Sequence, residues 1–282
     1  MRPRQKTLNR ATRLFKASIK IFGRKRATLI AAHLAEDLVP TMKRETAFGV
    51  IKFWCPGKIP VSRARTLLTK EPQTIAWIES FQNGDTLWDI GANVGVYSLY
   101  AAFKGHRVLA FEPSASNYHL LSRNIEINKK DRQISAYCVA FTDKTNLDVL
   151  YMGNTQVGAA ANSFGEAKDW QDRTFVPCFS QAMLGFSIDD FIKQFHPLFP
   201  NHIKIDVDGI EGKIVKGAKD TLSDKRVKSV LVELDIGRKD YCDQVIDVFA
   251  TSGFRFSNKD RSGNSNKRRG INVYNHIFVR AH

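Results

Sequence analysis

The sequence has few cysteines and no long apolar run. Its four cysteines are scattered along the chain, and no two of them form a C-x-x-C pair. This pattern argues against a disulfide framework or a zinc site and favours reduced thiols in a cytoplasmic protein. No stretch approaches the roughly 18 apolar residues that a membrane-spanning helix needs. A signal peptide is not expected either, because no continuous apolar stretch with a cleavage site follows the basic N-terminus.

Acidic residues are scarce relative to basic ones. The 282 residues include 43 Lys and Arg against 28 Asp and Glu, which gives a formal net charge of +15. Such an excess favours anionic partners, such as lipid surfaces, nucleic acid or phosphorylated substrates. With 43% hydrophobic and 25% charged residues, the composition is otherwise that of a globular protein long enough to bury a full core.

Residues 1–26 contain ten Lys and Arg and no acid at all. Apolar residues recur between these charges at helical spacing, namely Leu8, Ala11, Phe15, Ile19 and Phe22. The pattern predicts a basic amphipathic helix that ends at Gly23. Such a helix suits peripheral contact with an anionic membrane. The alternatives are a helix packed on the main domain and a solvated tail, and the sequence does not choose between the three.

The rest of the chain is organised around the stretch Thr86–Ser98, TLWDIGANVGVYS. It predicts a buried strand, a glycine turn and a helix start, the first unit of a doubly wound α/β domain. Ligands bind such domains outside the carboxyl ends of the strands. The third glycine of the dinucleotide fingerprint G-x-G-x-x-G is missing, because Val96 stands in its place. Instead Asp89 precedes the turn, and an acid there would repel a pyrophosphate but attract an ammonium or sulfonium group.

A second carboxylate follows the next predicted strand, Val108–Phe111. This is Glu112, which is placed to accept hydrogen bonds from both hydroxyls of a ribose. Together with Asp89 it favours S-adenosylmethionine over NAD as the ligand. The competing interpretation is that Asp89 caps a helix and Glu112 is a solvated strand end.

Further residues are expected in the same cofactor pocket. They are Gly91, Asn93, Gly95 and Ser98 of the glycine turn, Pro113 and Asn117 after the second strand, and Asp143. Asp143 follows a third strand predicted over Ile134–Phe141, where a carboxylate can accept a hydrogen bond from an adenine amino group. For Asn117 a surface amide, and for Asp143 a turn residue, is an equally good interpretation.

Several blocks of the chain resemble the FkbM family of S-adenosylmethionine-dependent methyltransferases. They are DIGANVGVYSL, AFEPSASNYHLLSRNI, SIDDF, KIDVDGIEGKIVKGAKDTL and SVLVELD, and the resemblance runs from about Thr66 to Val279. It implies a Rossmann-like class I methyltransferase fold: a mainly parallel, doubly wound α/β sheet with a C-terminal antiparallel strand pair and an N-terminal helical and β extension. It also implies methyl transfer, most often to oxygen, with a sugar hydroxyl of a glycan or a small metabolite as acceptor.

We therefore expect three parts: the basic segment 1–26, an extension or cap over 27–82, and the S-adenosylmethionine-binding domain over 83–282. Asn154–Phe164, which follows Gly153 and contains Gly158 and an alanine run, is typical of a flexible insertion that closes over a site.

Acidic side chains gather after the predicted fourth and fifth strands. Asp206 and Asp208 follow the fourth strand, and Glu233 follows the apolar core of the fifth. One interpretation makes Asp206 a general base, with a pKa raised by the neighbouring acids, that takes the proton of the substrate hydroxyl. In a second interpretation, the carboxylates of Asp206, Asp208 and Glu233 or Asp235 hold a divalent metal ion. The sequence does not assign any residue firmly to a metal.

Two more interpretations of this acidic region stay open. In the first of these, Lys204 has a depressed pKa and acts as the base in a proton-transfer network with Asp206 and Glu233. Alternatively, Asp208-Gly209 is only a turn and Glu211 only caps a helix.

Three other functions compete with the methyltransferase prediction for small acceptors. The positive charge slightly favours an RNA methyltransferase. The chain nevertheless lacks an Asn/Asp-Pro-Pro-aromatic motif and the basic–aromatic interleaving that stacks bases, so nucleic acid is not expected as a partner. The missing third glycine argues against an NAD-dependent oxidoreductase. A non-catalytic protein bound to an anionic membrane through the first helix is the alternative of a different class.

Overall fold

The computed structural model describes residues 3–261 and 272–281. It divides the chain into two units, Met1–Thr41 and Met42–His282, which are described separately. In the first unit, helix α1 (Pro3–Lys20) is followed by helix α2 (Arg24–Asp37). Gly23 lies between them with a φ of 78°, so the predicted end of the first helix is confirmed. No helix in the described part of the chain has the length and apolarity to cross a bilayer.

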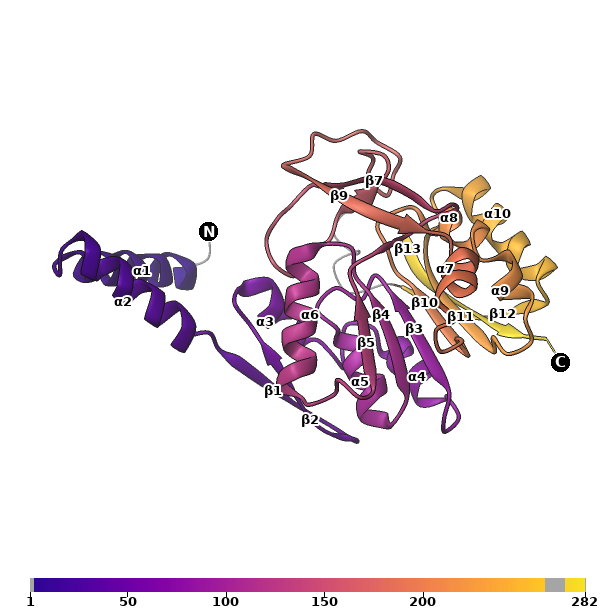
Figure 1. The fold of residues 1–282 in the computed structure, drawn as a ribbon, viewed down its shortest axis with the longest axis horizontal. Helices are drawn as coiled ribbons and strands as arrows, with labels where there is room; N and C mark the ends of the chain where they lie inside the picture. Colours follow the sequence, from indigo (N-terminus) through magenta and orange to yellow (C-terminus); the bar gives the residue numbers. More distant parts are fainter. Residues whose placement is uncertain (1–2, 262–271, 282) are drawn as a thin grey trace. The chain divides into compact units, whose positions relative to one another are not determined.

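The second unit contains a seven-stranded sheet (Figure 1). Its strands are β3 (Thr86–Ile90), β4 (Arg107–Phe111), β5 (Ile134–Tyr137), β10 (His202–Ile205), β11 (Ser229–Asp235), β12 (Phe254–Arg261) and β13 (Val273–Arg280). They lie in the order β12-β13-β11-β10-β3-β4-β5. β5, β4, β3, β10 and β11 are parallel, whereas β13 runs antiparallel to both β11 and β12. The predicted doubly wound sheet with a C-terminal antiparallel pair is confirmed.

Helices cover both faces of this sheet, because successive strand residues point to opposite sides. Trp88 and Ile90 pack with α7 (Ile188–Phe195), α8 (Glu211–Lys216), α9 (Lys219–Ser223) and α10 (Lys239–Thr251). Leu87 packs on the other face with α4 (Pro72–Glu79), α5 (Val96–Lys104) and α6 (Ala115–Ile127). The chain leaves β3 toward β4 on one side and reaches β10 on the other. The carboxyl ends of β3 and β10 therefore form the switch point at which doubly wound sheets bind ligands.

Residues 42–82 are part of this core. β1 (Thr41–Thr46) and β2 (Gly49–Trp54) form a two-stranded sheet, and α3 (Lys58–Arg65) follows. The backbone N–H of Trp54 donates to Asn124 Oδ1 at 2.8 Å, and that of Lys52 donates to Asn128 Oδ1 at 2.9 Å. Side chains of α6 thus satisfy the backbone of β2 and hold it against the domain. The structure divides the chain at Thr41, whereas the sequence predicts boundaries at residues 26 and 82.

A four-stranded sheet forms from the region around the predicted insertion Asn154–Phe164. The predicted strand Ile134–Phe141 breaks in two: β5 ends at Tyr137, and β6 (Ala140–Phe141) joins the second sheet. The other members are β7 (Asn146–Met152), β8 (Asn162–Phe164) and β9 (Phe179–Phe186), in the order β6-β9-β7-β8. Figure 1 shows β7 and β9 beyond the ends of the main strands.

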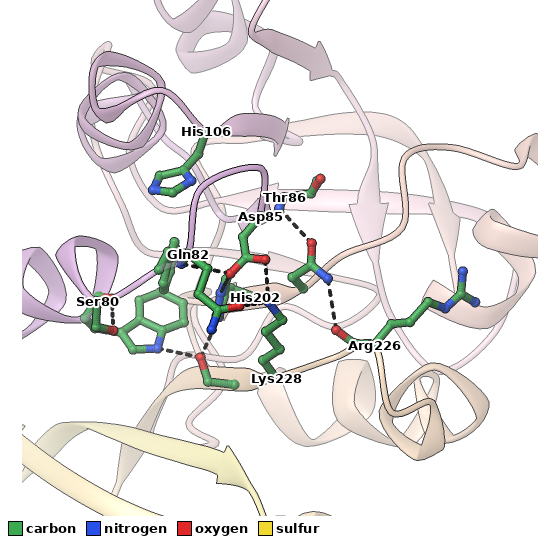
Figure 2. Close-up of polar contacts among 12 residues, drawn as sticks. Ser80, Gln82, Asp85, Thr86, His106, His202, Arg226 and Lys228 are labelled. Atoms are coloured by element: carbon green, nitrogen blue, oxygen red, sulfur yellow. Dashed lines mark hydrogen bonds and ion pairs between the residues drawn. The ribbon is translucent and has the colours of Figure 1, made fainter.

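A buried polar network fixes the opposite, amino ends of β3, β10 and β11 (Figure 2). His202 contacts Ser229 Oγ through Nδ1 at 2.7 Å and Asp85 Oδ2 through Nε2 at 2.9 Å. Lys228 Nζ lies 2.6 Å from Asp85 Oδ1. The Ser–His–Asp order is that of a hydrolase triad. Here, however, all three side chains are buried, and Trp77 Nε1 donates to Ser229 Oγ at 2.8 Å, so the network is structural.

Candidate functional site

A cavity of about 290 Å³ opens at the carboxyl ends of the parallel strands. It lies at the switch point, and it is lined by residues of the main sheet, the second sheet and α3. Its polar lining includes Arg63, Asn93, Glu112, Asn117, Asn162, Asp206, Asp208, Glu211, Glu233, Asp235, Arg238 and Tyr241. Its apolar walls include Val139, Phe141, Leu150 and Phe164. The second sheet therefore closes the space that the main sheet leaves open.

The glycine turn after β3 brings backbone to this cavity. Gly91 has a φ of +82°, and a Cβ added there would lie 1.9 Å from the carbonyl oxygen of Asp206. Only glycine fits this close approach of the two strand ends. Gly91 and Asn93 line the cavity, as predicted. Gly95 does not line it: a Cβ there would lie 2.5 Å from Leu121 Cδ1, so this glycine serves helix packing.

Glu112 is a buried carboxylate in the lining of the cavity. Its buried carboxylate accepts hydrogen bonds from the N–H groups of Asn93 at 2.8 Å and Ser114 at 3.0 Å. Asn117 Nδ2 donates to it at 3.3 Å. Burial raises the pKa of Glu112 to about 7, although these hydrogen bonds favour the ionised form. Glu112, Pro113 and Asn117 all line the cavity, where the sequence predicts them.

Asp89 and Ser98, which the sequence places in the cofactor pocket, do not line this cavity. Asp89 lies inside β3, one residue before its end, and is paired in register with Lys204 of β10. Its side chain points to the face covered by α5, where Ser98 Oγ donates to Asp89 Oδ2 at 2.5 Å. Burial raises the pKa of Asp89. Strand alternation thus places this carboxylate beside the buried Lys204 and away from the cavity lining.

Asp143 is also away from the cavity lining. Because β5 ends at Tyr137, its carboxyl end reaches the cavity at Val139. Asp143 comes after β6, and its backbone lies beside Gly217. The sequence prediction instead continues the third strand across the break between the two sheets.

Lys204 and Asp206 form a tight ion pair, with 2.5 Å between Nζ and Oδ2. The Lys204 side chain is 1% exposed and that of Asp206 is 27% exposed. Burial alone would lower the pKa of Lys204, but the carboxylates of Asp206, Asp89 and Glu71 raise it above its usual value. Burial alone would raise the pKa of Asp206, but the ammonium groups of Lys204 and Lys70 lower it. The pKa of Asp206 is therefore not raised and that of Lys204 is not lowered, in contrast to the two predictions of a catalytic base.

Asp208 lies beneath the covering segment, which we define as Gly158–Asn162. Its Oδ2 atom accepts hydrogen bonds from the N–H groups of Ala161 and Asn162. Burial raises the pKa of Asp208, although these N–H groups favour its ionised form. Asn93 and Asn117 donate through Nδ2 to the Ala159 carbonyl, at 2.9 and 3.1 Å. The predicted insertion thus covers the cavity in this structure, held by the residues that line it.

Two lining atoms have unused hydrogen-bonding capacity. The side-chain oxygens of Asn93 and Asn162 are buried, and neither has a hydrogen-bond partner within residues 3–261 and 272–281. A buried acceptor without a partner is costly, so both atoms destabilise the fold around the cavity.

The sequence treats Glu211 only as a helix cap, but its side chain lines the cavity. Its Oε1 atom accepts from the Gly209 N–H at 3.1 Å, and the Tyr241 hydroxyl donates to Oε2 at 3.1 Å. Burial raises the pKa of Glu211 to about 8. Arg238 and Arg63 also reach the cavity without a signal in the sequence; the Arg238 guanidinium lies 4.1 Å from the centre of the Tyr241 ring.

A metal ion has no ready site in this arrangement. Across the described residues, no three His, Cys, Asp or Glu side chains are grouped so that they could hold one. Asp206, a proposed ligand, is instead the partner of Lys204.

The strand order and the cavity at the switch point define a Rossmann-like methyltransferase fold. The family model described as the methyltransferase FkbM domain matches residues 89–256, which is more than half of the chain. The chain belongs to the FkbM methyltransferase family.

Two curated proteins that are named as methyltransferases are similar to this chain. Methyltransferase sdnD of Sordaria araneosa is 28% identical over 167 residues, which are 51% of this chain and 64% of that protein. Hexuronic acid methyltransferase AglP of Haloferax volcanii is 25% identical over 177 residues, 62% of this chain and 66% of that protein. The chain thus matches just under two thirds of the length of each.

Solved structures are similar to this chain at lower sequence identity. Methyltransferase FkbM from Methylobacillus flagellatus aligns with a TM-score of 0.46 at 16% identity, over 71% of this chain and 44% of that one. The tRNA m1G37 methyltransferase of M. jannaschii aligns with a TM-score of 0.47 at 12% identity, over 87% of this chain and 56% of that one. Similarity at this level carries no argument about substrate.

Proposed function

We propose that the chain is an S-adenosylmethionine-dependent methyltransferase that acts on a hydroxyl oxygen of a sugar or a small metabolite. The observation that carries the proposal is the position of Glu112, a carboxylate at the end of β4 that lines the cavity at the switch point. Membership of the FkbM family supports methyl transfer, and similarity to a hexuronic acid methyltransferase supports a sugar acceptor.

The cavity residues fit the cofactor. The Glu112 carboxylate would accept hydrogen bonds from the ribose hydroxyls. Asn93 and Asn117 also line the cavity beside Glu112, where their amide groups add polar surface for the same molecule. Val139 and Phe141 offer an apolar surface for the adenine ring. When bound, S-adenosylmethionine supplies a methyl group on a positively charged sulfur, and the acid-rich lining favours that charge.

The rest of the lining suits an acceptor with several hydroxyls. Glu233 and Asp235 extend from the end of β11 into the cavity wall, where carboxylates can accept O–H hydrogen bonds. Arg238 supplies a donor, held by a hydrogen bond from its Nη1 to the Trp170 carbonyl at 3.2 Å. Trp170 and Tyr241 add aromatic surface against which the C–H groups of a sugar ring can pack.

We assign the removal of the hydroxyl proton to Glu211. Its pKa of about 8 lies close to neutral pH, where a general base works best. Asp206 is less suited, because its carboxylate is neutralised by Lys204. The larger contribution of the protein is alignment, since holding the acceptor oxygen in line with the methyl group lowers the barrier more than proton transfer does.

Calorimetry of the full chain tests the cofactor assignment. We expect S-adenosylhomocysteine to bind and NAD not to bind; binding of NAD alone would contradict the proposal. The acceptor class is tested with methyl-labelled S-adenosylmethionine and neutral or uronic-acid-containing oligosaccharides. Label that survives mild alkali indicates a methyl ether on a hydroxyl, whereas alkali-labile label indicates a methyl ester and would contradict transfer to a hydroxyl.

A further inference from the structure

The unit Met1–Thr41 concentrates the positive charge of the chain. It contains ten Lys and Arg and two acids, so it carries a formal excess of eight positive charges out of +15. The basic side chains around the turn between α1 and α2 are exposed: Lys20, Arg24, Lys25 and Arg26. Charge of one sign on so short a segment attracts an anionic surface.

The same turn exposes large apolar side chains. Ile21 is 83% exposed and Phe22 is 59% exposed, and both lie between the end of α1 and Gly23. Leu14 and Phe15 of α1 and Leu29 of α2 are also exposed. None of the residues of α2 is buried. Exposed apolar side chains that cluster on a protein surface are typical of an interaction site for another protein or a membrane.

We propose that the α1–α2 unit docks on an anionic lipid bilayer. Ile21 and Phe22 insert between the lipid headgroups, and the basic residues around them, Lys20, Arg24, Lys25 and Arg26, contact the lipid phosphates. The arrangement matches the physics of interfacial helices, in which apolar side chains enter the acyl boundary and flanking cations bind anionic headgroups.

A bilayer explains both features of this turn, whereas other partners explain one. Nucleic acid would neutralise the cations but leave Ile21 and Phe22 in water. An apolar groove on a protein would cover the apolar pair but would need its own ring of acids to match four cations. The proposal is independent of the methyltransferase assignment, because none of these residues lines the cavity.

Flotation of the full chain with vesicles tests the proposal. We expect binding to vesicles of phosphatidylcholine with phosphatidylglycerol, no binding to phosphatidylcholine alone, and weaker binding as salt screens the charges. The double variant Ile21→Ser/Phe22→Ser should lower the partition coefficient at least tenfold. The matched control, Leu147→Ser/Val176→Ser, removes apolar residues that are 81% and 94% exposed in the other unit and should bind as the wild type does.

A second pair of variants tests the charges. Arg24→Gln/Lys25→Gln/Arg26→Gln should also lower binding at least tenfold, whereas Lys144→Gln/Lys219→Gln/Lys225→Gln, which removes three exposed charges elsewhere, should not. The proposal would be overturned if either test variant bound the vesicles as well as its matched control variant does. So would binding to duplex DNA or RNA without binding to vesicles. Calorimetry with S-adenosylhomocysteine on the same variants should give unchanged affinity, which separates this result from any failure of the cofactor assignment.

Discussion

Replacing Glu112 by Gln tests the cofactor pocket most directly. The carboxylate is proposed to accept two hydrogen bonds from the ribose, and hydrogen bonds to charged groups contribute about 1.5–3 kcal/mol each. Gln keeps one acceptor oxygen, loses the charge, and offers an amide where the second acceptor was. We expect a loss of about 2 kcal/mol in binding S-adenosylhomocysteine, which is a rise of roughly 30-fold in Kd.

The pH dependence gives the same experiment a second readout. The pKa of Glu112 in the free protein is about 7, and the ionised form is the better acceptor. Wild-type affinity should therefore rise as the pH increases through 7, and the affinity of Glu112→Gln should stay flat across that range. Calorimetry over this range measures both. An affinity within twofold of wild type would refute the proposed role of Glu112.

Two controls accompany this variant. Asp143→Asn removes the acid that the sequence places at the adenine and the structure places elsewhere, so its affinity should be unchanged. Glu112→Gln also turns an amide toward the N–H of Asn93 or Ser114, which should cost about 1–3 kcal/mol of folding free energy. A thermal melt of the variant therefore establishes that it is folded at the assay temperature.

Three further predictions concern the charged groups. Asp206→Asn leaves the buried Lys204 ammonium without its nearest counter-charge and should cost about 3 kcal/mol in urea melts; a loss below about 1 kcal/mol would show that the pair is dispensable. Glu211→Gln should lower kcat about 100-fold and remove its rise near pH 8, with the Kd for S-adenosylhomocysteine unchanged; wild-type kcat would reject Glu211 as the base. Burial lowers the pKa of His202 to about 4, so the native state binds fewer protons than the unfolded state, where the pKa is about 6.5. The free energy of unfolding should therefore fall by about 3 kcal/mol as the pH drops from about 6.5 to about 4, and urea melts of His202→Gln should lack this part of the dependence.

The parts of the site that the sequence predicts are those fixed by local chain geometry. Gly91 and Glu112 lie directly after short apolar strands, and the carboxyl ends of parallel strands meet at one edge of the sheet. Asp89 follows the same sequence pattern but does not line the cavity, because its place one residue inside β3 turns its side chain to the opposite face. A difference of a single residue decides between a ligand contact and a buried ion network, and strand ends cannot be placed that finely from sequence.

The residues that the sequence misses reach the site only through tertiary contacts. Burial raises the pKa of Glu211, and its side-chain partner Tyr241 comes thirty residues further along the chain. Arg63 lies in α3, before the first strand of the main sheet, and donates to the Gly158 carbonyl at 2.7 Å. No local pattern links these positions, since the second sheet that brings Gly158 to the cavity forms from a region that the sequence describes as mostly irregular.

The charge of the whole chain is a poor guide to the charge of its cavity. Within the described residues, the lining contains six Asp and Glu side chains and three Lys and Arg side chains, although basic residues outnumber acidic ones in the sequence. Charges lining a partly buried cavity act over short distances with little screening, so they, and not the net charge, set the preference of the site. An acid-rich lining favours a positively charged donor and opposes a polyanionic acceptor such as RNA. We therefore propose separate partners for the two units of the chain: a lipid surface for the ten basic residues of segment 1–26, and the methyl acceptor for the acid-rich cavity.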